Sequence, residues 1–304
     1  MVESAVSSNR IEGVEVDRQR VGTLVFGTDR SRDRNEEELR GYRRALEWIH
    51  GEHERIPHGE ATILRLHALS RGDAWDAGRY KERDGDIVET YADGRSRVRF
   101  ETVPALLVPG AMKELVELSA RAIEERWVPE PVRIAATNLD LLCIHPFRDG
   151  NGRVSRLLLL LEAYRSDLGV GRYVSLERII EQNRERYYET LEQSSAGWHE
   201  GRHDPWPYIN FVLSVVKEAY RDMEERLERT DAPRGEKTAA VLRAVAGREA
   251  PFAVQDLRRD CPGVGDDTIR RVLRGLRSEG KVECLGRGPR ARWRKTSDID
   301  TNGE

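Results

Sequence analysis

The sequence predicts a mainly α-helical chain of two domains, in which one β-hairpin interrupts a large helical core and a small basic domain follows. A length of 304 residues corresponds to about two domains. Apolar residues recur at helical spacing through most of residues 37–229, and the net charge changes sign near residue 234. Hydrophobic residues make up 38% of the chain and charged residues 35%, which allows a buried core beneath a densely ionic surface.

Helical periodicity defines the core. Leu39, Tyr42, Leu46 and Ile49, for example, fall on one helical stripe. The expected core helices cover residues 37–49, 61–70, 108–126, 132–145, 154–166, 176–193 and 206–229.

One segment has strand character instead. Residues 86–91 and 96–101 flank a turn near Asp93-Gly94, and Val98 and Phe100 alternate with arginines. This pattern predicts a β-hairpin between two core helices.

The charge asymmetry separates the two domains. Residues 234–295 contain 16 Arg and Lys against 8 Asp and Glu, whereas the whole chain has a net charge of −3. In this basic part we expect helices over 238–246, 254–260 and 266–279, the third capped by Asp266 or Asp267, followed by two short strands. The expected organisation is an N-terminal helical segment (1–60), a core (61–228), a linker (229–237), a C-terminal domain (238–296) and an acidic tail (297–304).

Several classes of protein do not fit this sequence. The purest apolar run, Leu157–Leu161, has five residues, which is too short to span a membrane. Residues Met1–Gly13 contain no apolar core of a signal peptide. Three cysteines without paired spacing argue against a disulfide scaffold and against a zinc site, and favour a reducing cytoplasm.

The segment with the most chemical information runs from His145 to Arg156 and reads HPFRDGNGRVSR. An apolar helix delivers His145 to its C-terminal end, and a glycine-containing loop then leads into a second apolar helix. Glycines and a helix N-terminus together present free N–H groups, which form an anion site. Asp149, beside this anion site, is suited to bind a Mg²⁺ ion that also contacts phosphate oxygens. Arg153 and Arg156 lie on one face of the helix and can both reach a polyphosphate. His145 lies where a general base would act.

Each of these features alone has an ordinary structural explanation. A histidine at a helix end is more often a cap than a base, and an Arg pair three residues apart is usually solvated. The alternative for the whole string is a simple helix–turn–helix corner. The phosphate-cradling order of its twelve residues argues against that alternative.

The string matches the signature of Fic-domain proteins, His-x-Phe-x-Asp/Glu-Gly-Asn-Gly-Arg-x-x-Arg, at every specified position. The surrounding sequence from about Ala61 to Val216 also resembles this family, including His67 and the later Gly78-Arg-Tyr-Lys81. The resemblance implies a mainly helical Fic fold that transfers AMP from ATP to a protein hydroxyl. The intact Gly-Asn-Gly string favours nucleotidyl transfer over the phosphoryl transfer of the related Doc type.

Site roles follow from the resemblance by position. It implies that His145 activates the Ser, Thr or Tyr hydroxyl of a target protein, and that Asp149 holds Mg²⁺ on the α- and β-phosphates. The implied phosphate-binding residues are Gly150, Asn151, Gly152, Arg153 and Arg156. Asn183 and Tyr187 lie where relatives contact nucleotide, and at most one of the adjacent Tyr187 and Tyr188 is expected to touch adenine.

Two further segments resemble regulatory and docking parts of the family. Ser8, Glu12 and Gly13 match an inhibitory motif, Ser/Thr-x-x-x-Glu-Gly/Asn, whose Glu pairs with the second signature arginine; the alternative is an ordinary surface helix. The hairpin corresponds to a flap that holds the target segment, or else is purely structural. Its expected target-binding residues are Asp86, Val88, Val98 and Phe100.

The C-terminal domain resembles a winged helix. Its candidate DNA-binding residues are Arg270, Arg271, Arg274 and Arg277 on the third helix and Arg290 and Arg292 on the wing. Because 45 of the 51 basic residues are arginine, the alternative of a protein-interaction or dimerisation module stays open.

The leading hypothesis is an autoinhibited protein adenylyltransferase that uses ATP and Mg²⁺ on an unidentified target protein. The alternatives are a nucleotide-sensing DNA-binding regulator with little turnover, or a de-AMPylase in which Glu12 supports the reverse reaction. Relatives often pair through the core, which leaves a homodimer open, and no membrane partner is expected.

Overall fold

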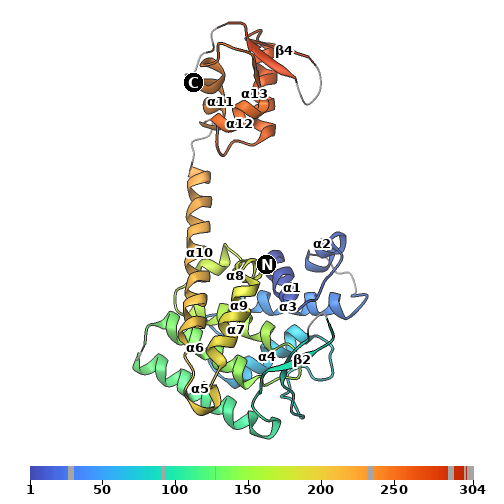
Figure 1. Cartoon of the computed structure of the whole chain (residues 1–304), viewed down its shortest axis with the longest axis vertical. Coiled ribbons are helices and arrows are strands. Elements are labelled where there is room, and N and C mark those ends of the chain that lie inside the picture. Colours follow the sequence, from blue (N-terminus) through green and yellow to red (C-terminus); the bar gives the residue numbers. More distant parts are fainter. Residues whose placement is uncertain are drawn as a thin grey trace. The chain divides into compact units, whose positions relative to one another are not determined.

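The chain is mainly helical, with two small antiparallel sheets (Figure 1). The computed structural model describes residues 1–26, 31–90, 93–126, 128–231, 236–286, 291–297 and 299. It forms two compact units, Met1–Met223 and Glu224–Glu304. Within the described ranges no helix has both the length and the apolar character to cross a membrane.

The first unit is built almost entirely from helices. Its α-helices are α1 (Val2–Ile11), α2 (Arg18–Phe26), α3 (Arg34–Glu52), α4 (Glu60–Arg71), α5 (Val108–Glu125), α6 (Glu130–Ile144), α7 (Asn151–Arg165), α8 (Leu176–Gln182), α9 (Arg184–Ser195) and α10 (Trp206–Asp231), the last of which continues past the boundary between the units. Short 3₁₀ helices are η1 (Ala105–Leu107), η2 (Gly169–Arg172) and η3 (Trp198–Glu200).

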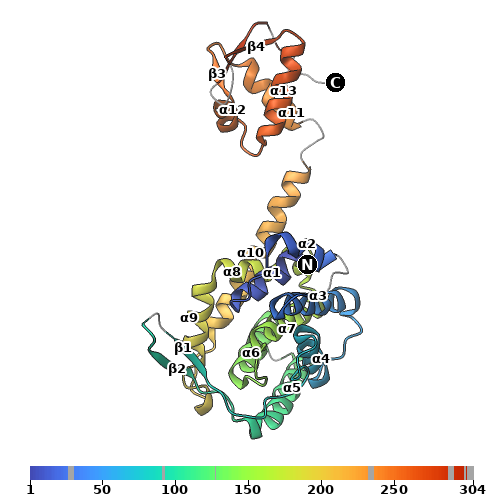
Figure 2. The ribbon, with the colours of Figure 1, turned by 90° about the vertical axis from the view of Figure 1, so that its right-hand side faces the viewer.

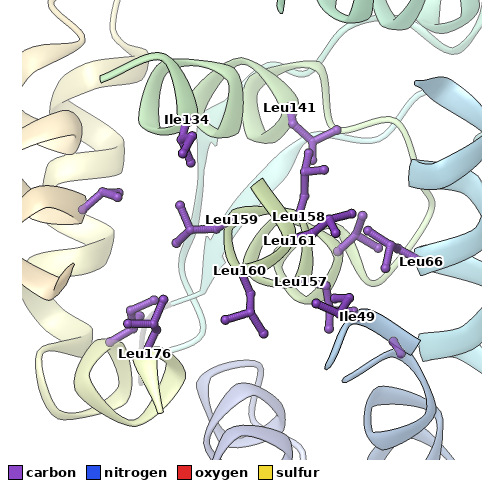
Figure 3. Packing of buried hydrophobic residues seen from close by; sticks show 14 of the residues in the cluster. Ile49, Leu66, Ile134, Leu141, Leu157, Leu158, Leu159, Leu160, Leu161 and Leu176 are labelled. Atoms are coloured by element: carbon purple, nitrogen blue, oxygen red, sulfur yellow. The ribbon is translucent and has the colours of Figure 1, made fainter. Parts of the chain in front are cut away.

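Helix α7 is the centre of this unit. Its five consecutive leucines, Leu157–Leu161, are all buried and point in every direction around the helix axis (Figure 3). A helix that is apolar on all sides must be surrounded by other elements, and α7 packs against α3, α4 and α6. The second half of the signature therefore lies at the N-terminal end of a helix that is buried on all sides.

A small residue lets two of the surrounding helices approach closely. Helices α3 and α4 lie side by side, and a Cβ atom at Gly41 would fall 2.6 Å from the carbonyl oxygens of both Leu69 and Ser70. No larger residue fits there without moving the α4 backbone. This contact positions the N-terminal half of α3 beside the C-terminal end of α4.

The hairpin between α4 and α5 consists of β1 (Ile87–Thr90) and β2 (Ser96–Phe100), which pair antiparallel. Ile87 pairs with Phe100 but Val88 pairs with Val98, so Arg99 is an extra residue in β2. Such a β-bulge re-aims a side chain, and here Arg99 reaches α9, beside which the hairpin lies in Figure 2. Ala92 of the expected turn lies outside the described residues.

One expected core helix is divided in two. The periodicity over 176–193 predicted a single helix, but α8 ends at Gln182 and α9 begins at Arg184. At Asn183 the backbone leaves the helical region (φ −113°, ψ 32°), and its amide side chain donates to the carbonyl of Ile179. Periodicity missed this break because the spacing of apolar residues does not report the backbone dihedral angles of a single residue.

The second unit has its own core around Val241, Phe252, Leu257, Ile269 and Leu273. Its elements are α11 (Glu236–Ala246), β3 (Phe252–Ala253), α12 (Val254–Asp260), α13 (Asp266–Ser278), β4 (Val282–Leu285) and β5 (Arg292–Lys295), with strand order β3-β5-β4. Residues 232–235 of the expected linker lie outside the described residues.

The cap of α13 differs from the expectation. Its N-cap residue is Gly265 with no side-chain cap, and both Asp266 and Asp267 lie in the first turn. There the carboxylates still interact favourably with the positive end of the helix dipole.

The burial of α7 gives a stability prediction. Leu157→Ala removes a fully buried side chain and should lower the free energy of unfolding by about 2–5 kcal/mol. Leu106→Ala, at a residue that is 90% exposed in the same unit, should change it by less than about 0.5 kcal/mol. Urea unfolding followed by circular dichroism compares the two, and equal losses would contradict the central position of α7.

Candidate active site

The signature loop is a rigid turn between α6 and α7. His145 ends α6 in the left-handed conformation (φ 51°, ψ 59°), and Gly150 precedes α7 with φ 86°. The side chain of Asn151, the first residue of α7, accepts a hydrogen bond from the N–H of Phe147 at 2.9 Å and donates to its carbonyl at 2.7 Å. Asn151 therefore closes the loop, a role that its polar side chain performs from a buried position.

His67 on α4 supports the same loop. Its ring stacks on Phe147 at 3.8 Å between centroids. Its Nδ1 accepts from the N–H of Gly78 at 2.9 Å, so Nε2 carries the proton and donates to the carbonyl of Asp149 at 3.0 Å. Burial lowers the pKa of His67 to about 4, which keeps this neutral tautomer at physiological pH.

His145 has the protonation state of a base. Its Nδ1 lies 3.3 Å from the carbonyl of Leu142, an acceptor, so Nδ1 is the protonated nitrogen and Nε2 keeps its lone pair. Burial lowers the pKa of His145 to about 4, and nearby Lys81 acts in the same direction. The imidazole is therefore neutral near pH 7 and able to accept a proton.

Two cavities meet at His145. One, of about 260 Å³, is also lined by Glu12, Gly152, Tyr187 and Tyr188. The other, of about 460 Å³, is lined on one side by Trp75, Lys81 and Arg148. His145 is therefore a lining residue that the two cavities share.

Asp149 lies in a cluster of arginines. Its carboxylate accepts hydrogen bonds from Arg34 at 2.5 Å, from Arg71 at 2.9 Å and from Arg153 at 3.4 Å. Burial raises the pKa of this carboxyl, but the Arg153, Arg71 and Arg34 guanidiniums outweigh burial and hold it below its usual value. Asp149 is therefore ionised, and its side chain is 43% exposed.

A second carboxylate, Glu38 of α3, holds the same arginines from the buried side. It pairs with Arg34 at 2.9 Å, Arg71 at 2.7 Å and Arg153 at 3.0 Å, and its side chain is only 4% exposed. The sequence analysis did not identify Glu38, Arg34 or Arg71. No local signal could have done so, because the three lie far from the signature in sequence and meet it only through α3–α4 packing.

Arg156 faces a different partner. Its guanidinium donates to Glu12 Oε1 at 2.7 Å, to Ser8 Oγ at 2.8 Å and to the Ser8 carbonyl at 3.0 Å. Burial lowers the pKa of Arg156, but Glu12 more than compensates and the pKa lies above its usual value. The expected inhibitory residues Ser8 and Glu12 are thus in direct contact with the second signature arginine.

The segment that carries Glu12 is well anchored. Helix α1 packs mainly on α8 and α3, and Ser4 bonds Ser175 across the first contact at 3.0 Å. The Tyr188 hydroxyl donates to the carbonyl of Ile11, directly before Glu12, at 3.1 Å. Gly13 follows with φ 76°, a left-handed conformation that ends α1.

The residues around Asp149 and Arg156 are chemically suited to a nucleoside triphosphate and to a Mg²⁺ ion bound by both Asp149 and the phosphate oxygens. Nη1 of Arg156 is buried without a hydrogen-bond partner in the described part of the chain, so a donor is free for an anion. A Cβ at Gly152 would collide with Glu12 Oε1, so this glycine provides space that Glu12 now uses. Among the described residues no group of three metal-ligating side chains exists, and Asp149 alone suits an ion whose other ligands are phosphate oxygens and water.

The remaining nucleotide candidates occupy different environments. Asn183 caps the junction of α8 and α9. Tyr187 is 3% exposed and packs against Tyr208 and Phe211, whereas Tyr188 is half-buried between the Arg99 and Arg184 guanidiniums. Both tyrosines line the 260 Å³ cavity.

The flap candidates are arranged along the hairpin. Val88 and Val98 form a cross-strand pair and are 52% and 54% exposed. Phe100 instead stacks on His199, and Asp86 accepts from the N–H of Thr102 at 3.3 Å. The exposed apolar pair lies on the hairpin, whereas Phe100 and Asp86 secure its base.

The basic candidates of the second unit that the structure describes are exposed and lie on two elements. Arg270, Arg271, Arg274 and Arg277 are exposed on α13, and Arg292 is exposed on β5. Arg290 lies outside the described residues. Arg270 lies 4.0 Å from Asp266, so one acidic group partly neutralises this surface.

The comparisons with known proteins define the class. Residues 57–163 match the model of the Fic/DOC family. A curated "Protein adenylyltransferase Fic" from Culex quinquefasciatus is 36% identical over 95 residues, which are 31% of this chain and 17% of that relative. The chain thus spans well under two thirds of the length of the curated relative that it matches.

Solved structures share the fold. A Fic family protein from Desulfovibrio desulfuricans G20 superposes with a TM-score of 0.60 and 22% identity, covering 98% of this chain and 87% of that one. Fic-1 from C. elegans gives a TM-score of 0.57 and 23% identity, over 75% of this chain and 63% of that one. Residues 57–163 therefore resemble the Fic/DOC family, and the fold that the chain shares with these structures extends beyond them.

The environment of His145 gives a titration prediction. Because burial disfavours the charged form, we expect the His145 ring to titrate near pH 4 and to be neutral throughout pH 6–8. Histidine NMR signals followed against pH, with His145→Ala to assign the resonance, measure this value. A midpoint above 6 would contradict the buried neutral base.

Proposed function

We propose that this protein is an adenylyltransferase that transfers AMP from ATP to a Ser, Thr or Tyr hydroxyl of another protein, and that its N-terminal segment inhibits it. The observation that carries the proposal is the contact of Glu12 with Arg156 across the glycine of the signature. A carboxylate that occupies a phosphate-binding arginine beside a neutral histidine is the arrangement expected of a restrained nucleotidyl transferase.

The transfer would begin with the acceptor hydroxyl next to His145. Nε2 takes the hydroxyl proton while the oxygen forms a bond to the α-phosphorus, and the bond between the α-phosphorus and the bridging oxygen to the β-phosphate breaks to release pyrophosphate. The N–H groups at the start of α7, with Arg153, stabilise the charge on the phosphate oxygens. Asp149 would hold Mg²⁺, which neutralises phosphate charge when bound.

Inhibition would act on the far end of the triphosphate. With Glu12 on Arg156, the guanidinium cannot donate both forks to a γ-phosphate, and the carboxylate repels that phosphate. ATP would then bind in a geometry that does not align the α-phosphorus with the acceptor. Release of α1 from α8 and α3 would free Arg156.

The hairpin would present the target. Its exposed Val88 and Val98 can contact an extended segment that pairs with a strand through main-chain hydrogen bonds. This mode of binding is largely independent of side chains, so the target protein itself remains to be found by labelling.

Labelling with α-³²P-ATP and Mg²⁺ tests the proposal. Glu12→Gly should raise self-labelling and labelling of lysate proteins by a factor on the order of tenfold to a hundredfold, because it removes a charge-assisted hydrogen bond of about 1.5–3 kcal/mol. Glu12→Gly with His145→Ala should abolish the label.

The matched control is Glu15→Gly, which removes an exposed carboxylate three residues further on. It should label like the unmodified chain. Equal labelling of Glu12→Gly and Glu15→Gly would refute inhibition by Glu12. Absence of label in every variant would refute adenylyl transfer, and loss of AMP from a premodified target would then favour the reverse reaction.

A second function is proposed for the C-terminal unit: binding of DNA by a winged-helix domain. The observation that favours it is the position of Arg271, Arg274 and Arg277 on the exposed face of α13, opposite its buried Ile269, Val272 and Leu273. A helix of this kind can enter the major groove while basic strand residues contact phosphates.

A salt titration tests DNA binding. The logarithm of the binding constant for a mixed-sequence DNA duplex should fall linearly with the logarithm of the salt concentration. The double substitution Arg271→Ala with Arg274→Ala should reduce the magnitude of this slope by about 2. Replacement of Arg121 and Arg126, exposed arginines of the first unit, should leave the slope unchanged. Absent or salt-independent binding would favour a protein-interaction module.

A further inference from the structure

Arg34 is a third arginine that pairs with Asp149, the carboxylate expected to bind the metal. It lies outside the signature sequence. Arg34, at the first turn of α3, donates to Asp149 Oδ2 at 2.5 Å and to Glu38 Oε1 at 2.9 Å. Residues 57–163 match the Fic/DOC model, so Arg34 lies ahead of the matched domain. Neither the signature nor the inhibitory motif includes it.

The three arginines around Asp149 differ in their exposure to solvent. The side chains of Arg71 and Arg153 are 6% and 2% exposed, and both are fixed from behind by the buried Glu38. Arg71 is also paired with Asp76 at 3.3 Å. The side chain of Arg34 is 67% exposed and reaches Asp149 from solvent. Arg34 alone can leave the cluster without burying or exposing a core group.

The charges of the cluster are balanced only with Arg34 in place. Three guanidiniums, from Arg34, Arg71 and Arg153, face three carboxylates, from Glu38, Asp76 and Asp149. The neighbouring His67 is neutral. When Arg34 leaves, one negative charge is uncompensated, and it lies on the carboxylate with the greatest exposure to solvent. A divalent cation would be attracted to that position.

We propose that Arg34 is an internal competitor for the metal: its guanidinium occupies Asp149 Oδ2, and Mg²⁺ binds only when Arg34 has moved away. This inference rests on the proposed function, since that function assigns the metal to Asp149. It adds a second restraint from the N-terminal segment. Glu12 blocks the site of a phosphate, and Arg34 blocks the site of its counter-ion.

The test measures metal dependence and not turnover. A fluorescent ATP analogue with a non-cleavable bridge between its α- and β-phosphorus is bound to the Glu12→Gly chain while Mg²⁺ is varied, and the Mg²⁺ concentration at half-maximal binding is recorded. Arg34→Ala in the same background should lower this concentration about threefold to fivefold, the range for an ion pair of which one partner is exposed. Arg34→Lys should give an intermediate value, because an ammonium keeps the charge but cannot span Glu38 and Asp149 as a guanidinium does.

Arg40→Ala is the matched control. Arg40 lies on the same helix and donates to Ser31, so its removal costs the same charge without touching Asp149. It should leave the Mg²⁺ midpoint unchanged. Thermal unfolding followed by circular dichroism verifies that each variant is folded.

Three outcomes would overturn the inference. Equal Mg²⁺ midpoints for Arg34→Ala and Arg40→Ala would show that Arg34 does not compete with the metal. Weaker analogue binding by Arg34→Ala at saturating Mg²⁺ would make Arg34 a phosphate ligand instead. Absence of analogue binding in all variants would show that the proposed nucleotide site does not exist. Binding with the expected midpoints but no transferred label would count against the proposed activity alone.

Discussion

Two arginines inside the packed N-terminal turn of α7 impose the main constraint on this structure. Arg153 and Arg156 have side chains only 2% exposed, and a buried guanidinium is strongly unfavourable without a counter-ion. The described core supplies those counter-ions from the N-terminal segment: Glu38 on α3 for Arg153 and Glu12 after α1 for Arg156. The way α1 and α3 pack on the core therefore follows from charge neutralisation as much as from apolar burial.

The same constraint explains the dual character of the site. A phosphate group and a carboxylate can both form bidentate hydrogen bonds with a guanidinium. Under the proposed function, Glu12 and Glu38 therefore pair with arginines that could also bind the oxygens of a phosphate. Nη1 of Arg156 is buried without a hydrogen-bond partner among the described residues, so Glu12 and Ser8 satisfy this guanidinium only in part.

The features of the site that are formed by neighbouring residues in the chain could be predicted from the sequence. The signature loop is continuous in the chain, so its glycines, its histidine and its helix boundary are readable from spacing, and the Arg156–Glu12 contact was accessible through a second family-like motif. The mainly helical Fic fold was predicted in the same way. In contrast, the cluster formed by Glu38, Arg71 and Arg34 depends on how α3 packs against α4 at Gly41. The periodicity of apolar residues does not indicate which polar residue of a helix contacts a loop that is distant in sequence. The break at Asn183 and the uncapped start of α13 were misread because apolar spacing does not report backbone dihedral angles.

The docking of α1 has a thermodynamic consequence beyond the proposed inhibition. If α1 and a triphosphate satisfy the same guanidinium, each weakens the other by an identical free energy, since coupling between two binding events is reciprocal. Under the proposed function, a change that makes the N-terminal helix pack more firmly onto α8, such as tighter packing around the Ser4–Ser175 contact, would lower nucleotide affinity by at most this coupling free energy. The stability of the N-terminal segment and the affinity for nucleotide would then be linked, and substitutions far from the signature would change both.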